Sequence, residues 1–381
     1  MIFCPIAEKA RSRPNHFAIY SDEGVYTYEK LNQLIDQNED ETETFYADCS
    51  ISSIVRFFSL IRQGRVAFPI SKKEPILPNV NTSSVPNGIH TLIYTSGTIG
   101  RPKIAMHTIK HHVFSAKNQL KGVEMEPDDS YLLSLPINHI SGIAILYRVF
   151  CSGASLIIGN KHRRLATHIS FVPTQLKRFL QSSEHLCFNR LKCVLLGGAP
   201  IPKDLCDWAI SHYIPLYITY GMSETASQIA TMKYDPRCGV CFKEPLHGRD
   251  LKIDAQGQIW VAGMTLFKGY LNYESPIENG WFPTRDLGRI GKYGLEIIGR
   301  KDRMIISGGE NIYLDELEAQ FLSIPSVDSV IISSRKSEEF GCRPKAKIHV
   351  RDPISKKEII NHLQKVLPKY KIPDEEDISI H

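Results

Sequence analysis

Apolar and polar residues along the middle of the chain follow strand and helix patterns in turn. Between residues 91 and about 240, short β-branched and aromatic runs predict strands at Thr91–Tyr94, Tyr131–Leu135, Ser155–Ile158, Ile169–Val172, Cys193–Leu196 and Leu216–Tyr220. Amphipathic runs between them predict helices at Thr108–Leu120, Ser141–Phe150, Thr174–Leu180 and Lys203–His212. This alternation predicts an α/β fold in which helices cover a mostly parallel sheet.

The flanking segments follow other patterns. Before residue 90, the sequence predicts short helices and one strand pair, at Ile6–Ala10, Tyr28–Ile35, Ile51–Ile61, Ala18–Tyr20 and Val25–Tyr26. From about 241 to 299, short strands with glycine turns include a hairpin of Leu251–Asp254 and Ile259–Ala262. A compact α+β unit is predicted from Leu314–Leu322, Val327–Ser333, Lys345–Val350 and Lys356–Leu367. We therefore expect a large unit at 1–300, divided near 90 and 240, and a small unit at 301–381.

Composition narrows the function classes. The 381 residues include 46 basic and 41 acidic side chains, a net charge of +5, which modestly favours anionic ligands and gives no argument for nucleic acid. No apolar run approaches the roughly 20 residues of a membrane span. The nine cysteines are scattered and odd in number, so we expect reduced thiols in a cytoplasmic protein. Cys238 and Cys241 form a single C-x-x-C pair, for which metal or redox use is a minor alternative.

Hydroxyls, glycines and cations follow the first predicted strand of the middle region. The run TLIYTSGTIGRPK supplies Thr95, Ser96, Gly97, Thr98, Gly100 and Lys103. Glycines let backbone N–H groups turn toward an anion, and lysine adds a point charge, so the run suits a polyphosphate. The spacing is not that of the common nucleotide-binding P-loop. The alternative is a polar turn between a strand and a helix.

Three further groups of candidate residues fall at predicted strand ends, where α/β sheets bind ligands. They are His139 in PINHISG, the run Gly198, Ala199 and Pro200, and the run Tyr220, Gly221, Ser223 and Glu224. Tyr220 offers a π face to a base, and Ser223 can bond a phosphate oxygen. Glu224 can hold Mg²⁺, which prefers oxygen ligands shared with phosphates. The alternatives without a binding role are a structural histidine at 139 and a simple turn at 198–200.

These motifs, in this order, resemble those of the adenylate-forming superfamily of acyl-CoA synthetases, luciferases and peptide-synthetase adenylation domains. The phosphate-loop pattern of that family is Tyr-Thr-Ser-Gly-Ser/Thr-Thr-Gly-x-Pro-Lys-Gly, from which Ile99 and Ile104 depart. The runs YGMSETASQIA, PINHISG and LLGGAPIP most resemble the o-succinylbenzoate–CoA ligases of menaquinone synthesis. The resemblance implies a large domain of mixed sheets with a β-barrel-like subdomain, followed by a small mobile domain.

The same resemblance implies an ATP-dependent acid–CoA ligase that uses Mg²⁺ and coenzyme A, with a possible homodimer. In that reading Lys103 and Glu224 are catalytic, His139 lines the acyl pocket, and Gly198–Pro200 lie against adenine. The residues implied beyond position 280 are Asp286 for the ribose, Arg300 for ribose or phosphate, Asp302 for the hinge, and Gly308 and Gly309 for the CoA arm. A carboxylate such as Asp286 also suits a cis-diol on chemical grounds.

Three departures favour an alternative, in which the chain binds a nucleotide or acyl-adenylate without full activity. Ile99 in the phosphate-loop run is the first. Arg285 stands where the family pattern Gly-Trp-Phe-x-Thr-Gly-Asp has glycine. The family also ends in Gly-Lys, whereas this sequence ends at His381, and Lys369 or Lys371 are possible substitutes. We therefore expect weakened adenylation, since one preorganised charge is typically worth about 10²–10³ in rate. A fatty or other aryl acid is the alternative substrate.

Overall fold

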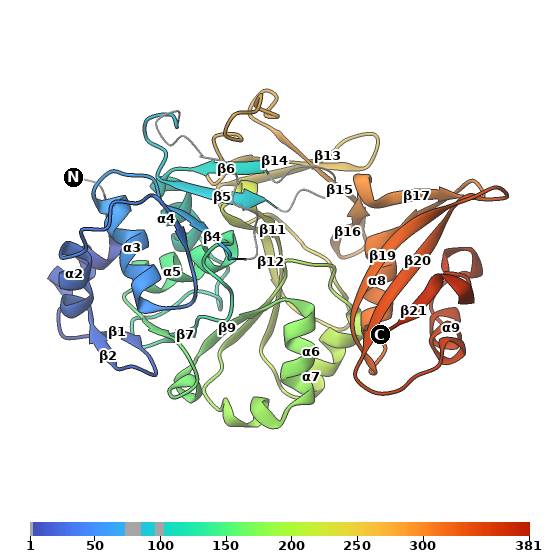
Figure 1. The fold of residues 1–381 in the computed structure, drawn as a ribbon, viewed down its shortest axis with the longest axis horizontal. Coiled ribbons are helices and arrows are strands. Elements are labelled where there is room, and N and C mark those ends of the chain that lie inside the picture. Colours follow the sequence, from blue (N-terminus) through green and yellow to red (C-terminus); the bar gives the residue numbers. More distant parts are fainter. Residues whose placement is uncertain (1–2, 73–84, 96–102) are drawn as a thin grey trace.

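The largest sheet organises the middle of the molecule. The computed structural model describes residues 3–72, 85–95 and 103–381 (Figure 1). Eight strands lie in the order β12-β11-β10-β9-β7-β8-β1-β2. Their bounds are β1 (Phe17–Tyr20), β2 (Val25–Thr27), β7 (Ser130–Leu132), β8 (Ser155–Ile157), β9 (His168–Phe171), β10 (Cys193–Leu196), β11 (Leu216–Met222) and β12 (Ser227–Lys233). The six central strands pair in parallel and the two edge pairs are antiparallel, which confirms the predicted α/β class.

Helices bury apolar faces around this sheet. They are α1 (Pro5–Ser12), α2 (Tyr28–Asp36), α3 (Ile51–Arg62), α4 (Ile109–Lys117), α5 (Ile140–Ser152), α6 (Pro173–Gln181) and α7 (Lys203–Ser211). Helix α5 is predominantly apolar and largely buried, as expected for a central helix. It packs with α3 through the fully buried rings of Phe57, Phe58, Tyr147 and Phe150. Removing any of these rings would cost about 3–5 kcal/mol.

One predicted strand lies in a different sheet from the one expected. Strand β5 (Thr91–Thr95) pairs antiparallel with β6 (Lys103–His107) and not with the large sheet. All five β5 residues are buried, so a continuous apolar run did not reveal which sheet it joins. Strand β6 was not predicted. A separate parallel pair, β3 (Thr44–Tyr46) and β4 (Phe68–Ile70), lies beside β5 through a bridge from Ala67 to Thr91.

The segment after residue 240 forms an antiparallel sheet of four strands. They are β13 (Arg249–Ile253), β14 (Gln258–Gly263), β15 (Phe282–Gly291) and β16 (Gly294–Arg300), in that order. The predicted hairpin is confirmed as β13 and β14, with Ile253 opposite Ile259. Apolar residues of β14 and β15 join the same hydrophobic cluster as β9–β12, which fixes this sheet against the large one.

The C-terminal residues form a further sheet with its own hydrophobic cluster. Its elements are β17 (Met304–Ser307), β18 (Glu310–Tyr313), α8 (Leu314–Ser323), β19 (Val327–Ser337), β20 (Gly341–Val350), α9 (Lys356–Gln364) and β21 (Ile378–Ile380). The strand order is β18-β17-β20-β19, and β21 pairs with β20. In Figure 1 this orange and red part lies beside α6 and α7. The predicted unit boundary near residue 300 stays a prediction.

Short 3₁₀ turns complete the fold. They are η2 (Arg163–Leu165), η3 (Ser183–Cys187), η4 (Ser223–Thr225), η5 (Lys301–Arg303), η6 (Lys369–Lys371) and η7 (Glu375–Asp377). Among the described residues, no helix has the length and apolar character that a bilayer crossing requires.

Lys177 on α6 ties the C-terminal part to the rest. Its buried ammonium donates to the carbonyl oxygens of Leu322 at 2.8 Å and Ile324 at 2.6 Å, and also to that of Val327. These carbonyls surround the C-terminal end of α8, where a cation is favoured by the helix dipole. Burial lowers the pKa of Lys177 to about 8. The α6 face therefore holds the α8–β19 turn through one fully enclosed cation.

Candidate active site

Three of the predicted residues meet where the large sheet faces the β13–β16 sheet. Tyr220 lies on β11, and its Oη donates a hydrogen bond to Asp286 Oδ2 on β15 at 2.7 Å. Asp286 lies directly opposite Arg300 in the β15–β16 register, and the Arg300 guanidinium is 3.4 Å from Asp286 Oδ1. Strand β11 extends to Met222, two residues past its predicted end at Tyr220, so Gly221 lies within the strand.

A β-bulge in β15 orients the Asp286 side chain toward Tyr220. Pro283 pairs with Trp260 and Leu287 with Gln258, so three residues of β15 face Ile259 alone. Thr284 pins the bulge, because its hydroxyl donates to the Ile259 carbonyl at 2.8 Å and accepts the Asp286 N–H at 3.0 Å. Burial raises the pKa of Asp286 to about 6, although Tyr220 and Arg300 oppose the shift. The site thus holds a carboxyl group that titrates close to neutrality.

Glu224 forms the second carboxylate of the site. It lies in η4, just after β11, and its Oε1 accepts a hydrogen bond from Tyr270 Oη at 2.5 Å. Burial raises the pKa of Glu224, while the Tyr270 hydrogen bond and the charges of Arg300 and Lys103 lower it. A carboxylate held among cations in this way can accept a metal ion together with an anionic ligand.

Lys103 begins β6 on the other side of Tyr270. Its Nζ lies 4.8 Å from the Tyr270 ring centroid and 5.3 Å from that of Tyr273. Thr95 ends β5, and its hydroxyl donates to the Lys103 carbonyl at 3.3 Å. Ser96, Gly97, Thr98 and Gly100 lie outside the described residues. Thr95 and Lys103, the two ends of the predicted phosphate loop, are therefore held next to the hydrogen-bonded pair of Glu224 and Tyr270.

The other predicted site residues lie on separate elements. Gly198, with φ of 77°, and Ala199 and Pro200 follow β10, next to Gly197, which packs against Thr219 of β11. His139 is exposed and is the N-cap residue that precedes α5, seven residues after β7 ends and not directly past a strand as predicted. Among the described residues, no polar contact joins His139 to Glu224 or Asp286. Gly308 and Gly309 form the β17–β18 turn, with φ of 58° and 85° that glycine adopts easily.

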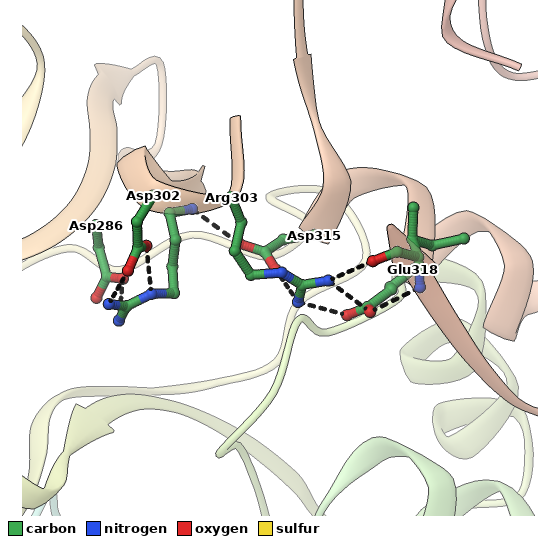
Figure 2. Close-up of polar contacts among 7 residues, drawn as sticks. Asp286, Asp302, Arg303, Asp315 and Glu318 are labelled. Atoms are coloured by element: carbon green, nitrogen blue, oxygen red, sulfur yellow. Dashed lines mark hydrogen bonds and ion pairs between the residues drawn. The ribbon is translucent and has the colours of Figure 1, made fainter. Parts of the chain in front are cut away.

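Two arginines three residues apart connect the site to the C-terminal sheet. Figure 2 shows their carboxylate partners side by side. Arg300 Nε donates to Asp302 Oδ1 at 2.9 Å, and the Arg300 backbone N–H donates to Asp315 at 2.8 Å. Arg303 donates to Asp315 at 2.6 Å and to the two oxygens of Glu318 at 2.9 and 2.7 Å. The Arg303 cluster was not predicted, because its partners come from a helix with no motif.

Sequence reasoning also missed a buried histidine behind Glu224. His107 ends β6, and its Nε2 lies 2.8 Å from the Ser223 carbonyl oxygen. Burial lowers the pKa of His107 to about 3, so the ring is neutral at pH 7 and donates this hydrogen bond. Its Nδ1 lies 3.3 Å from His111 Nδ1. His107 could have been noticed as the last residue of a strand, but strand β6 itself was not predicted.

Comparison with known proteins identifies the family. The model of the AMP-binding enzyme family matches residues 39–271. The 2-succinylbenzoate–CoA ligase of Bacillus subtilis (strain 168) is 34% identical over 310 residues, which are 74% of this chain and 63% of that protein. The ligase of the same name from Haemophilus influenzae is 37% identical over 297 residues, covering 74% of this chain and 65% of the relative. The aligned part therefore spans somewhat less than two thirds of these relatives.

Solved structures of the same type share the whole fold. An arginine-to-lysine variant of E. coli MenE with bound OSB-AMS superposes with a TM-score of 0.84 at 25% identity, covering 100% of this chain and 96% of that one. The Bacillus subtilis o-succinylbenzoate CoA synthetase in complex with the acyl-adenylate intermediate OSB-AMP gives a TM-score of 0.84 at 25% identity, covering 99% and 94%. By family model, curated relatives and fold together, the chain belongs to the AMP-binding enzyme family.

Proposed function

We propose that this protein is an ATP-dependent acid–CoA ligase and that its acid is 2-succinylbenzoate. The observation that carries the proposal is the convergence of Tyr220, Asp286, Arg300, Glu224 and Lys103 from four strands and one 3₁₀ turn. The relatives named 2-succinylbenzoate–CoA ligase support this choice of acid.

The reaction has two steps. The acid carboxylate attacks the α-phosphate of ATP, which gives an acyl-adenylate and pyrophosphate. The thiol of coenzyme A then attacks the acyl carbon and releases AMP. Both steps depend on holding the reactants in line and on stabilising charge on phosphate and carbonyl oxygens, for which fixed cations and dipoles are suited.

Each residue of the cluster has a part in this scheme. Asp286 accepts hydrogen bonds from the ribose hydroxyls, while Tyr220 orients its carboxylate and offers a ring face to the base. Lys103 and Arg300 neutralise phosphate charge beside Glu224. Glu224 fits Mg²⁺, because a half-buried carboxylate next to a phosphate site is the usual protein ligand for that ion. When bound, Mg²⁺ supplies Lewis-acid charge on the phosphate oxygens.

The other predicted residues complete the proposal. We place adenine against Gly198, Ala199 and Pro200 and the acid near His139. The unit at 301–381 would turn about Asp302 and bring Gly308 and Gly309 toward the CoA arm. We also propose a cytoplasmic location, which the nine free cysteines support, and a homodimer stays a prediction.

Exchange of labelled pyrophosphate into ATP tests the adenylation step. We expect exchange that depends on 2-succinylbenzoate and is much weaker with benzoate or a fatty acid. Exchange with a fatty acid alone would change the acid and keep the ligase. ATP binding without exchange for any acid would favour the nucleotide-binding alternative.

The variant Lys103→Ala tests the cluster itself. We expect exchange to fall by about 10²–10³ with folding intact, since one preorganised charge leaves the site. Lys233→Ala, which removes an exposed lysine from the end of β12, is the matched control and should exchange normally. Unchanged exchange in Lys103→Ala would remove that residue from the site.

A further inference from the structure

The bulge in β15 holds an arginine in a backbone conformation that suits glycine. Arg285 has a φ of 65°, in the left-handed region. For a residue with a Cβ, this conformation is disfavoured, and such residues persist only where the surrounding structure imposes them. Here the bulge imposes it, because Arg285 lies between Thr284, which is hydrogen-bonded to β14, and Asp286, which is bonded to Tyr220.

Packing does not account for an arginine at this position. The Arg285 side chain is exposed, and among the described residues its guanidinium makes no hydrogen bond or ion pair. Arg289, four residues along the same strand, is also exposed but pairs with Glu296 at 2.8 Å. The Arg285 cation is therefore available to a ligand, whereas the Arg289 cation is already paired.

The surroundings of Arg285 point to an anionic ligand. Its charge acts on the Tyr270 phenol, where it opposes the burial that raises the pKa of that group. Tyr270 is the residue that bonds Glu224 and lies under Lys103. Arg300 acts on the same phenol. Lys103 lies over the Tyr270 ring, and Arg300 is already paired with Asp286 and Asp302. Arg285 therefore adds a cation to this part of the site that no carboxylate of the described residues pairs.

We propose that Arg285 binds a phosphate group of the nucleotide, and that the strained bulge exists to hold its guanidinium there. The planar guanidinium can donate two parallel hydrogen bonds to a phosphate, which a lysine cannot. The inference rests on the proposed function, because it assigns Arg285 to the same site. It makes Arg285 a binding residue that adds to Lys103 and Arg300.

Calorimetric titration with ATP and with adenosine, both with Mg²⁺ present, tests the assignment. In Arg285→Ala we expect ATP to bind about tenfold more weakly, or worse, while adenosine binds as in the wild type, since adenosine has no phosphate. Arg285→Gly should lose ATP affinity equally, yet its melting temperature should not fall, because glycine adopts this φ without strain. Arg289→Ala is the matched control and should bind both ligands normally.

Several outcomes would overturn the assignment. Wild-type ATP affinity in Arg285→Ala, or an equal loss in Arg289→Ala, would show that Arg285 makes no specific contact. A parallel loss of adenosine affinity would mean that the pocket is deformed and not that a phosphate contact is missing. A wild-type protein that fails to bind ATP at all would instead contradict the proposed function, so the two failures are distinguishable.

Discussion

Arg300 and Arg303 lie three residues apart and differ in how tightly the protein holds them. Arg303 is enclosed by Asp315 and Glu318, and it also donates to the Ile332 carbonyl at 3.3 Å (Figure 2). Arg300 is a third exposed, holds Asp302 at 2.9 Å, and reaches Asp286 only at 3.4 Å. The Arg303 partners come from the helix and strand of the C-terminal sheet, whereas Asp286 belongs to the candidate site.

The difference separates a structural arginine from one that can bind a ligand. Both terminal nitrogens of Arg303 donate within the protein, to Asp315 and Glu318 of α8 and to the Ile332 carbonyl of β19, so Arg303 joins η5 to α8 and β19. Arg300 keeps a longer and weaker contact to a carboxyl group whose pKa is already raised to about 6. A ligand can replace a contact of this kind at low cost, while it cannot replace the contacts of Arg303 without unfolding the cluster.

The largest effect should come from Arg303→Ala. Removal of the guanidinium leaves the buried carboxylate of Asp315 without its charge partner, so we expect the free energy of unfolding to fall by about 3 kcal/mol. Urea denaturation measures the change. Arg289→Ala, which breaks an exposed ion pair, should cost less than about 1 kcal/mol. Full stability in Arg303→Ala would mean that the enclosed cluster contributes nothing.

Arg300→Ala should show the opposite profile. We expect ATP-dependent pyrophosphate exchange to fall by roughly 10–100-fold, because a cation is lost beside the phosphates, while stability changes by about 1 kcal/mol or less. Exchange assays and urea denaturation on the same preparation separate the two effects. If Arg300→Ala unfolds as easily as Arg303→Ala, the distinction between the two arginines is wrong.

The pKa of Asp286, the carboxylate partner of Arg300, predicts how stability depends on pH. Its folded pKa of about 6 lies above the ordinary value of 3.8, so between these values the native state binds a proton that the unfolded state lacks. Asp286 therefore favours folding more as the pH falls below about 6. Relative to Asp286→Asn, the wild type should gain about 1 kcal/mol of stability between pH 7 and pH 5.

Nucleotide affinity should also depend on the protonation of Asp286, but it should fall as the pH falls, whereas stability rises. Below pH 6 the protonated Asp286 is a poorer acceptor for ribose hydroxyls and no longer attracts Arg300, so adenosine should bind more weakly. Asp286→Asn should bind weakly at every pH in this range. A pH-independent affinity in the wild type would show that Asp286 does not contact the ligand.

The smallest effect concerns Lys177, which holds the α8–β19 turn next to the Arg303 cluster. In Lys177→Met we expect faster amide hydrogen exchange at residues 322–328 and a stability loss of about 1 kcal/mol, because several carbonyls lose one donor. Exchange near Arg300 should be unchanged. If amide exchange became equally faster near Arg300 and near Arg303, the two arginines would belong to one cooperative unfolding unit.

Three residues that the sequence suggested, Tyr220, Asp286 and Arg300, are in contact in the structure, whereas the arrangement of the strands around them was predicted less well. Tyr220 and Glu224 were predicted because residues of unusual type follow an apolar run, a local signal, whereas Asp286 and Arg300 were expected from the resemblance to a known family. Tyr270 and His107 were missed because they act on residues 46 and 116 positions away, and no local pattern records such contacts. The same limit placed β5 in the wrong sheet.

Backbone strain was equally hidden from the sequence. Arg285 stood out only as a departure from a family pattern, with no indication of whether it helped or blocked. Its φ of 65° and its position in the bulge became visible only in three dimensions. In the C-terminal part, in contrast, α8, β19, β20 and α9 were predicted close to their observed positions, because each is long and strongly patterned, whereas the short strands β18 and β21 were not predicted.

The pairing of Asp286 with Arg300 across a single hairpin has a consequence for how the molecule folds. Their separation along the chain is short, so the loop that must close between them is small and can form within microseconds. Tyr220 is 66 positions from Asp286 and can reach it only after the large sheet has docked. We therefore expect the acid–base pair to assemble early, as an unfinished binding surface, and the tyrosine hydroxyl to complete it last.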